Sequence, residues 1–193
     1  CMLVCLSHVA DVQKCCMHMK TAETRNNISD ACRFIDDQTT NTLEIVQQAA
    51  ALMTADGRAM TDDNIFSILE RYSIMETFSE VYYIDAENTI YQPGSVKRLL
   101  ADAEIREQLV AGVSKVYVDN VETGDGYRGC VFYMVPVNRG YAHFGELVAV
   151  QEIGDLLQSS SFQTLGEEGD VYLIGAKGSV YAKKEKNHAL TEE

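Results

Sequence analysis

Residues Val81–Tyr91 read VYYIDAENTIY, and residues Val171–Tyr181 read VYLIGAKGSVY. Each stretch is a run of β-branched and aromatic residues, then a short polar turn around Asn or Gly, then a second such run. This pattern predicts a β-hairpin in each place. The likeness of the two stretches arises either from shared strand propensity or from a repeated structural unit, and the rest of the chain has to decide between these explanations.

The composition is that of a folded soluble domain and excludes two classes of partner. The 193 residues are 46% hydrophobic and 23% charged, and the formal net charge is −13, so the chain is long and apolar enough to bury a core. Nucleic-acid binding needs a basic surface that releases counterions, and an acidic surface is equally unsuited to an anionic membrane. We therefore expect no nucleic-acid partner.

The N-terminal region is rich in cysteine but lacks the spacing of a metal site. Cys15, Cys16 and His18 stand close together, without the second pair of ligands that a zinc site requires. We expect thiols here, with no metal and no cofactor. No stretch has the ~18 consecutive apolar residues of a membrane span. Because the chain does not begin with Met, we expect a fragment or a processed product.

Residues 21–53 contain no Gly or Pro and predict a long amphipathic helix. Apolar or small residues step alternately by four and three in a heptad-like seam: Ile28, Cys32, Ile35, Thr39, Thr42, Val46, Ala49 and Met53. If helix also covered the first twenty residues, it would be about 75 Å long at ~1.5 Å per residue, and its seam would be a homodimer face. The alternative is a helix broken near Asn26, whose second half packs on its own domain.

The rest of the chain alternates helix and strand signals. Thr61 is expected to cap a second helix over 62–72, and Ser95 is expected to cap a third over 96–110. Turn residues separate three consecutive strands, expected over 114–120, 127–137 and 141–153. A short helix is expected over 154–165, before the second hairpin. These elements predict an α+β fold with a five-stranded antiparallel sheet, and the second hairpin lies outside that sheet.

Several motifs resemble the Cache or PDC sensor domains. These are PAS-like domains found outside the membrane in bacterial diguanylate cyclases, sensor histidine kinases and chemoreceptors. The first hairpin reads F-x-x-V-Y-Y-I-D-x-x-N-x-I-Y over 78–91, and a later strand contains V-P-V over 135–137. G-E-L-V-A-V follows over 145–150, and G-D-V-Y-L-I opens the second hairpin at Gly169. The likeness covers about residues 21–184.

This resemblance implies both a domain organisation and a setting. Residues 1–56 would be a stalk helix, 57–163 the PAS-like sensor domain that cups a small ligand, and 164–193 a membrane-proximal hairpin and polar tail. The chain would be the extracytoplasmic domain of a cell-membrane receptor whose flanking spans lie outside it. Any catalytic output domain would lie elsewhere in the parent protein, so the chain itself would not be an enzyme.

The sequence offers a binding site and no catalytic machinery. Neither a nucleophile elbow nor a phosphate loop is present, and the four histidines lack metal-ligand spacing. Strand alternation places Lys115, Tyr117 and Asp119 on one face, with Val116 and Val118 on the other. Adding arginines and tyrosines from neighbouring elements, the predicted ligand-binding residues are Tyr91, Arg98, Tyr117, Asp119, Arg128 and Tyr133.

These side chains suit a small molecule such as an amino acid or a small carboxylate. Arginine would pair with a carboxylate and aspartate with an amine, while the tyrosines would form walls. The chain departs from the amino-acid-binding Cache pattern, which includes an aromatic residue that is often Trp, because it contains no Trp.

The sequence thus predicts an extracytoplasmic ligand-sensing domain that relays its signal through the stalk helix. Two other classes stay open. One is a cytosolic PAS- or GAF-like regulatory module that holds a cofactor or a cyclic nucleotide, which would suit six cysteines in a reducing compartment. The other is the binding domain of a surface lipoprotein anchored through Cys1.

Overall fold

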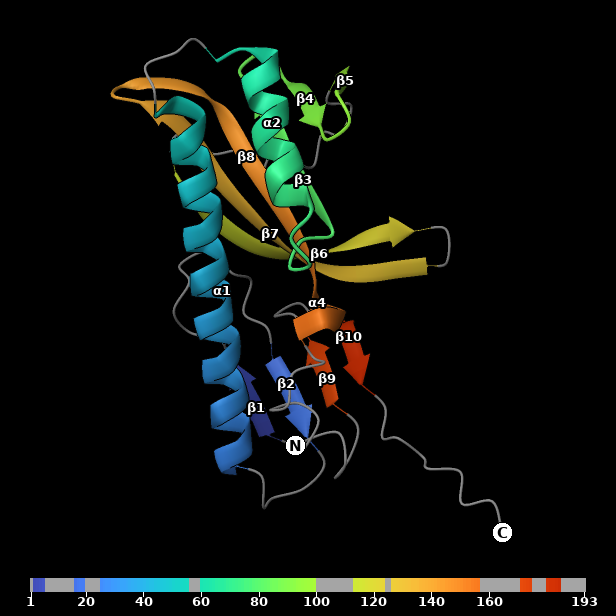
Figure 1. Cartoon of the computed structure of the whole chain (residues 1–193). Coiled ribbons are helices and arrows are strands. Elements are labelled where there is room, and N and C mark those ends of the chain that lie inside the picture. The colour runs from blue at the N-terminus through green and yellow to red at the C-terminus, as the bar shows by residue number, and fades with distance from the viewer. Residues whose placement is uncertain are drawn as a thin grey trace. The chain divides into compact units, whose positions relative to one another are not determined.

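A computed structural model of the chain describes residues 2–5, 16–19, 25–55, 60–99, 113–123, 126–156, 171–174 and 180–184 (Figure 1). The helices are α1 (Arg25–Thr54), α2 (Asp62–Ser73) and α4 (Ile153–Leu156). The strands are β1 (Met2–Cys5), β2 (Cys16–Met19), β3 (Glu80–Asp85), β4 (Thr89–Gln92), β5 (Val96–Leu99), β6 (Lys115–Thr123), β7 (Gly126–Arg139), β8 (Ala142–Glu152), β9 (Val171–Ile174) and β10 (Val180–Lys184). The predicted α+β class is confirmed.

Contacts divide the chain into two compact units. Unit 1 comprises Cys1–Thr39, Val118–Cys130 and Glu152–Glu193, and unit 2 comprises Thr40–Tyr117 and Val131–Gln151. Unit 1 therefore joins segments from both ends of the chain, whereas the predicted boundaries after residues 56 and 163 divide the chain linearly.

The main sheet has six strands in the order β5-β4-β3-β8-β7-β6 (Figure 1). Its first hairpin forms as predicted, with Tyr83 of β3 opposite Tyr91 of β4. The Asp85 carboxylate accepts hydrogen bonds from the backbone N–H groups of Glu87 (3.0 Å) and Thr89 (2.7 Å) and so closes the turn. The three consecutive strands predicted after this hairpin also form, as β6, β7 and β8.

The sheet has one more strand than predicted, because Val96–Leu99 is a strand and not the start of a helix. Gly94 and Ser95 have φ values of 78° and 61°, so Ser95 lacks the extended backbone that a helix N-cap requires. These two residues reverse the chain, and β5 then pairs with β4 in the register Tyr91 to Lys97. The rest of the predicted third helix lies outside the described residues.

The second hairpin lies outside the main sheet, as predicted. Strands β9 and β10 belong to a four-stranded sheet in the order β1-β2-β9-β10 (Figure 1). Its other members occupy Met2–Cys5 and Cys16–Met19, so the extension of the long helix over the first twenty residues is wrong at those positions. Apolar runs of four residues suit a strand as well as a helix, and pairing between β2 and β9 selects the strand.

The predicted long helix forms as α1, but its seam is buried within the chain. The buried residues include Ile35, Thr39, Thr42, Val46, Ala49 and Met53, each at most 6% exposed. This seam is therefore not a free homodimer face, and the alternative in which the helix packs on its own domain fits it better. A heptad-like step of 3.5 residues is close to the helical period of 3.6, so the sequence pattern could not tell the two cases apart.

The second helix, α2, begins at its predicted cap. The Thr61 hydroxyl accepts a hydrogen bond from the backbone N–H of Asn64 (3.4 Å), and Asp62 and Asp63 occupy the first turn, where carboxylates favour the helix dipole. Ile65, Phe66 and Leu69 are buried on its inner face. These contacts fix α2 on the part of the main sheet that contains β3 and β4.

Candidate ligand-binding site

The main sheet presents two faces, which the strand register identifies. Residues paired across antiparallel strands project from the same face. The Phe66 ring of α2 lies 5.8 Å from the Tyr91 ring, so Tyr91 and its register partners Tyr83 and Lys97 define the helix face. The far face carries the alternate residues of each strand: Tyr82, Ile84, Ile90, Arg98, Glu146 and Val148.

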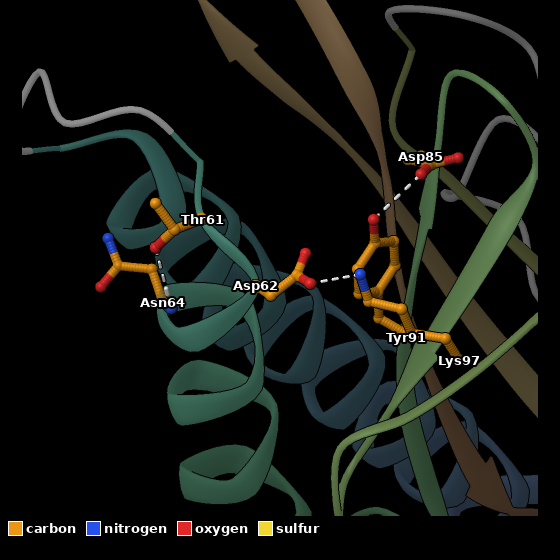
Figure 2. A network of polar contacts seen from close by, with 6 residues as sticks. All are labelled: Thr61, Asp62, Asn64, Asp85, Tyr91 and Lys97. Atoms are coloured by element: carbon orange, nitrogen blue, oxygen red, sulfur yellow. Dashed lines mark hydrogen bonds and ion pairs between the residues drawn. The ribbon is translucent and has the colours of Figure 1, made fainter.

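A network of polar contacts joins α2 to the hairpin on the helix face (Figure 2). The Tyr91 hydroxyl donates a hydrogen bond to the Asp85 carboxylate (3.2 Å), and the Lys97 ammonium lies 4.6 Å from the centre of the Tyr91 ring. Lys97 also forms an ion pair with Asp62 at the start of α2. These charges are engaged with one another, so the network holds α2 against β4 and β5.

Burial and neighbouring charges both shift the pKa values of side chains in and beside this network. Burial raises the pKa of Tyr83 and also the pKa of Tyr91, and the nearby carboxylate of Asp85 adds to both effects. The hydrogen bond to Asp62 raises the pKa of Lys97. At neutral pH the two tyrosines are therefore hydroxyl donors and Lys97 is a cation, as the observed contacts require.

The far face carries a row of buried aromatic and aliphatic side chains, although α2 lies on the other face. Tyr82, Ile84 and Ile90 are at most 5% exposed. Farther along the sheet, the Tyr117 ring of β6 stacks on the Phe132 ring of β7, with 4.8 Å between centroids and 7° between planes. The Lys115 ammonium lies 5.6 Å from the centre of the Tyr117 ring, which confirms that Lys115 and Tyr117 share a face.

Alternation along β7 and β8 assigns the stacked pair to the far face. Val148 pairs with Tyr82 on the far face, so Gln151, three residues on, lies on the helix face. The Tyr133 hydroxyl donates a hydrogen bond to the Gln151 side chain (2.9 Å), which places Tyr133 on the helix face as well. Phe132 precedes Tyr133 in β7, so Phe132 and Tyr117 project from the far face.

A buried carboxylate, that of Glu146, also projects from the far face. Glu146 lies on the central strand β8 opposite Ile84, and the residue is only 4% exposed. Its Oε1 atom lies 3.5 Å from Nε2 of His143, and Nδ1 of His143 lies 2.9 Å from Oδ1 of Asn138. A carboxylate is costly to bury without partners, and His143 is one of the partners of Glu146. As a buried charged group on this face, Glu146 is a candidate for recognition of a cation.

The structure divides the six predicted site residues into separate groups. Tyr91 and Tyr133 lie on the helix face, whereas Arg98 and Tyr117 lie on the far face, at opposite ends of the sheet. Asp119 and Arg128 belong to unit 1. The Asp119 carboxylate accepts a hydrogen bond from the Asn120 backbone N–H (2.8 Å), and Arg128 forms an ion pair with Glu152 (2.8 Å).

Two far-face residues, Tyr82 and Glu146, are missing from the predicted set. Tyr82 sits in the quoted hairpin, where four consecutive apolar and aromatic residues hide the alternation between faces. Glu146 had a clearer signal, because it is the one charged residue in the apolar strand segment G-E-L-V-A-V. A lone charge on a strand that is buried along its length marks a functional candidate.

Two negative findings hold for the described residues. Within those ranges, no three His, Cys, Asp or Glu side chains come together as metal ligands would. No helix in the described part of the chain combines the length and the hydropathy that a membrane crossing requires. Cys130 is buried and Cys32 half-buried, both as thiols.

Comparison with known proteins identifies the fold. No protein-family model matches the chain, and no curated protein matches it by sequence. Among solved structures, the chain is similar to the sensory domain of the Campylobacter jejuni chemoreceptor Tlp3 with isoleucine bound. The TM-score is 0.59 at 15% identity, covering 82% of this chain and 68% of that one.

Two further structures are similar to the same extent. One is the ligand-binding domain of the Pseudomonas aeruginosa PAO1 amino acid chemoreceptor PctC in complex with GABA, with a TM-score of 0.58 at 15% identity, covering 83% of this chain and 76% of that one. The other is the extracellular domain of vpHK1S-Z8, described as a histidine kinase, with a TM-score of 0.56 at 12% identity, covering 69% of this chain and 59% of that one. The predicted resemblance to Cache sensor domains is confirmed at the level of the fold.

Proposed function

We propose that this chain is the extracytoplasmic ligand-sensing domain of a membrane-bound bacterial signalling receptor. The observation that carries the proposal is the structural similarity to chemoreceptor sensory domains over 82% of the chain. The chain senses a small molecule and passes the signal through α1 to an output domain elsewhere in the receptor. It performs no catalysis itself, and any homodimer uses a face of α1 other than the buried seam.

We place the ligand on the far face of the main sheet, around Glu146. The buried carboxylate recognises an ammonium or another cationic group, and Tyr82 and the Tyr117–Phe132 stack supply apolar walls. Of the other residues predicted from the sequence, Arg98 shares this face and suits the carboxylate end of a ligand. The ligand roles of Tyr91, Asp119, Arg128 and Tyr133 stay predictions.

The spacing of Glu146 and Arg98 favours a zwitterionic ligand. Strands β8 and β5 are three strand spacings apart, or about 14 Å along the sheet at ~4.8 Å per strand. Both side chains are long and reduce this span, so a small molecule with opposite charges at its ends can bridge the remainder. An amino acid or an ω-amino acid has this form.

A thermal-shift screen of amino acids, ω-amino acids, primary amines and small carboxylates tests the site, with calorimetry on every hit. Glu146→Gln should weaken the binding of a cationic ligand by about 1.5–3 kcal/mol, the usual contribution of a hydrogen bond to a charged group. This corresponds to a loss of affinity of roughly 10- to 150-fold. Glu80→Gln is the matched control, because Glu80 is an exposed carboxylate of the neighbouring strand. Arg128→Ala should leave ligand binding at the far-face site unchanged. It should weaken binding if the ligand occupies the wider site that was predicted from the sequence.

The screen has two outcomes that contradict the proposal. Hits that bind Glu146→Gln and wild type equally would show that the ligand sits elsewhere. A complete lack of stabilising compounds would argue against small-molecule sensing itself. Placement outside the cytoplasm is tested separately, by fusing alkaline phosphatase after Glu193 in the parent protein, since that reporter is active only after export.

A further inference from the structure

Two cysteines occupy directly opposite positions in the register of β1 and β2. The two strands pair antiparallel, and Cys5 at the end of β1 is the partner of Cys16 at the start of β2 (Figure 1). The register runs without a shift from the pair Met2 and Met19 to this pair. The sequence predicted only thiols in this region, because the spacing of cysteines along a chain carries no information about strand register.

Opposite positions of an antiparallel pair meet the backbone requirement for a disulfide. The two Cα atoms are about 4.5 Å apart at a non-hydrogen-bonded position and about 5.5 Å apart at a hydrogen-bonded position. Disulfides span Cα–Cα distances of about 4.4–6.8 Å, so either kind of pairing falls within this range. Opposite residues also belong to the same face of a sheet. The register therefore allows a bond between Cys5 and Cys16 without a change in strand pairing.

Strand β1 is the member of the four-stranded sheet that gains most from a crosslink. It has four residues, lies at the edge of the sheet, and pairs with β2 alone among the described strands. Strand β2 is held on its other side by β9, through pairs that include Cys16 with Ile174. Residues 6–15 separate β1 from β2, which is longer than the usual hairpin connection of about two to five residues. A short strand joined by a long connection is weakly held, so a bond at Cys5 would fix its register.

We propose that Cys5 and Cys16 form a disulfide that ties β1 to β2 when the chain meets an external disulfide as oxidant. The proposal rests on the proposed function only for its oxidising setting, and formation of the bond in vitro is independent of ligand sensing. Compartments outside the cytoplasm let disulfides form and persist, whereas cytosolic thiols are kept reduced. Cys32 and Cys130, which are thiols in the structure, take no part in this bond.

The bond forms by thiol–disulfide exchange, in which the external disulfide accepts the electrons. The thiolate of one cysteine attacks a sulfur of glutathione disulfide, forms a mixed disulfide and releases one glutathione thiolate. The thiolate of the other cysteine then attacks the protein sulfur of the mixed disulfide and releases the second glutathione thiolate. The protein loses two protons and two electrons and gains one S–S bond, while glutathione disulfide loses its S–S bond and becomes two thiols.

Tryptic mapping of the full 193-residue chain tests the bond, because Lys14 lies between the two cysteines in the sequence. The folded chain is equilibrated with glutathione and glutathione disulfide, blocked with N-ethylmaleimide, and digested without reductant. Cleavage after Lys14 and Lys20 releases the peptides 1–14 and 15–20. The monomeric protein should yield these two peptides joined, and dithiothreitol should separate them. Recovery of the two peptides separately before reduction would overturn the proposal.

Neighbouring cysteines supply matched controls, since each of the two peptides contains a second cysteine. At the same ratio of glutathione to glutathione disulfide, Cys5→Ser and Cys16→Ser should each remove most of the joined peptides. Cys1→Ser and Cys15→Ser should each leave their yield unchanged. Joined peptides that survive Cys16→Ser and disappear in Cys15→Ser would assign the bond to another pair of cysteines and overturn the proposal. Joined peptides found only in a covalent dimer would overturn it as well, because the bond would then link two chains.

Discussion

Gly145 permits a close approach between two central strands of the main sheet, β8 and β3. It has a φ of 145°, and a Cβ atom at this position would lie 2.1 Å from the Ile84 carbonyl oxygen and 2.8 Å from the Tyr83 hydroxyl oxygen. Both contacts are far shorter than van der Waals distance, so no other residue fits without movement of β3 or β8. The glycine also precedes Glu146, so it fixes the start of the strand segment that carries the candidate ligand carboxylate.

Replacing Gly145 with alanine should therefore be strongly destabilising. We expect Gly145→Ala to lower the free energy of unfolding by about 2–4 kcal/mol, because backbone strain and overpacking act together. Urea unfolding followed by circular dichroism measures the change. Gly154→Ala is the matched control, since a Cβ there meets nothing within 4 Å, and its effect should stay within about 1 kcal/mol. Equal stability of the two variants would contradict the close approach.

Among the elements, α2 depends on local signals at its start and on packing along its length. The cap at Thr61 and the acidic first turn are short-range features, whereas the burial of Ile65, Phe66 and Leu69 requires the sheet. Lys97 adds an ion pair with Asp62, but both partners are substantially exposed, and pairs of this kind contribute little. The cap and the apolar face therefore carry most of the stability of α2.

The cap makes a specific prediction. Thr61→Ala should cost about 0.5–2 kcal/mol of unfolding free energy, while Thr61→Asp should retain most of the stability, because its carboxylate can accept the same backbone hydrogen bond. Ser67→Ala, on the exposed side of the same helix, is the control and should change little. Thermal unfolding of the three variants beside wild type provides the measurement. A larger loss in Ser67→Ala than in Thr61→Ala would show that the cap is unimportant.

At the scale of the whole molecule, burial of the α1 seam within its own chain distinguishes a single stable domain from a dimer held together by that seam. Val46 is 2% exposed, whereas Leu52 on the same helix is 48% exposed. A charge at Val46 would be buried without a partner, so Val46→Asp should lower the free energy of unfolding by more than about 3 kcal/mol. Leu52→Asp should fold normally.

Sedimentation and thermal unfolding at several protein concentrations distinguish burial from association. If the seam is internal, Val46→Asp loses stability to the same degree at every concentration. A well-folded Val46→Asp that differs from wild type only in its degree of association would instead show that the seam is an interface between two chains.

The sequence alone determined the elements whose signals are local. The hairpin around Asp85, the Thr61 cap, the long helix and the three consecutive strands follow from propensity, turn chemistry and period, which neighbouring residues supply. The resemblance to sensor domains likewise followed from short motifs, and the solved structures confirm it for the fold.

Only the tertiary structure decided which elements pair and which face each side chain occupies. Val96–Leu99 is a strand because the positive φ values of Gly94 and Ser95 reverse the chain and bring this segment beside β4, with which it pairs. The seam of α1 packs inside the chain. The sequence could not predict this, because periodicity identifies the apolar side of a helix and not what covers that side. Glu146 and Tyr82 came to share a face with Arg98 through the register of four strands, and strand register depends on pairing between distant segments that no single stretch of sequence encodes.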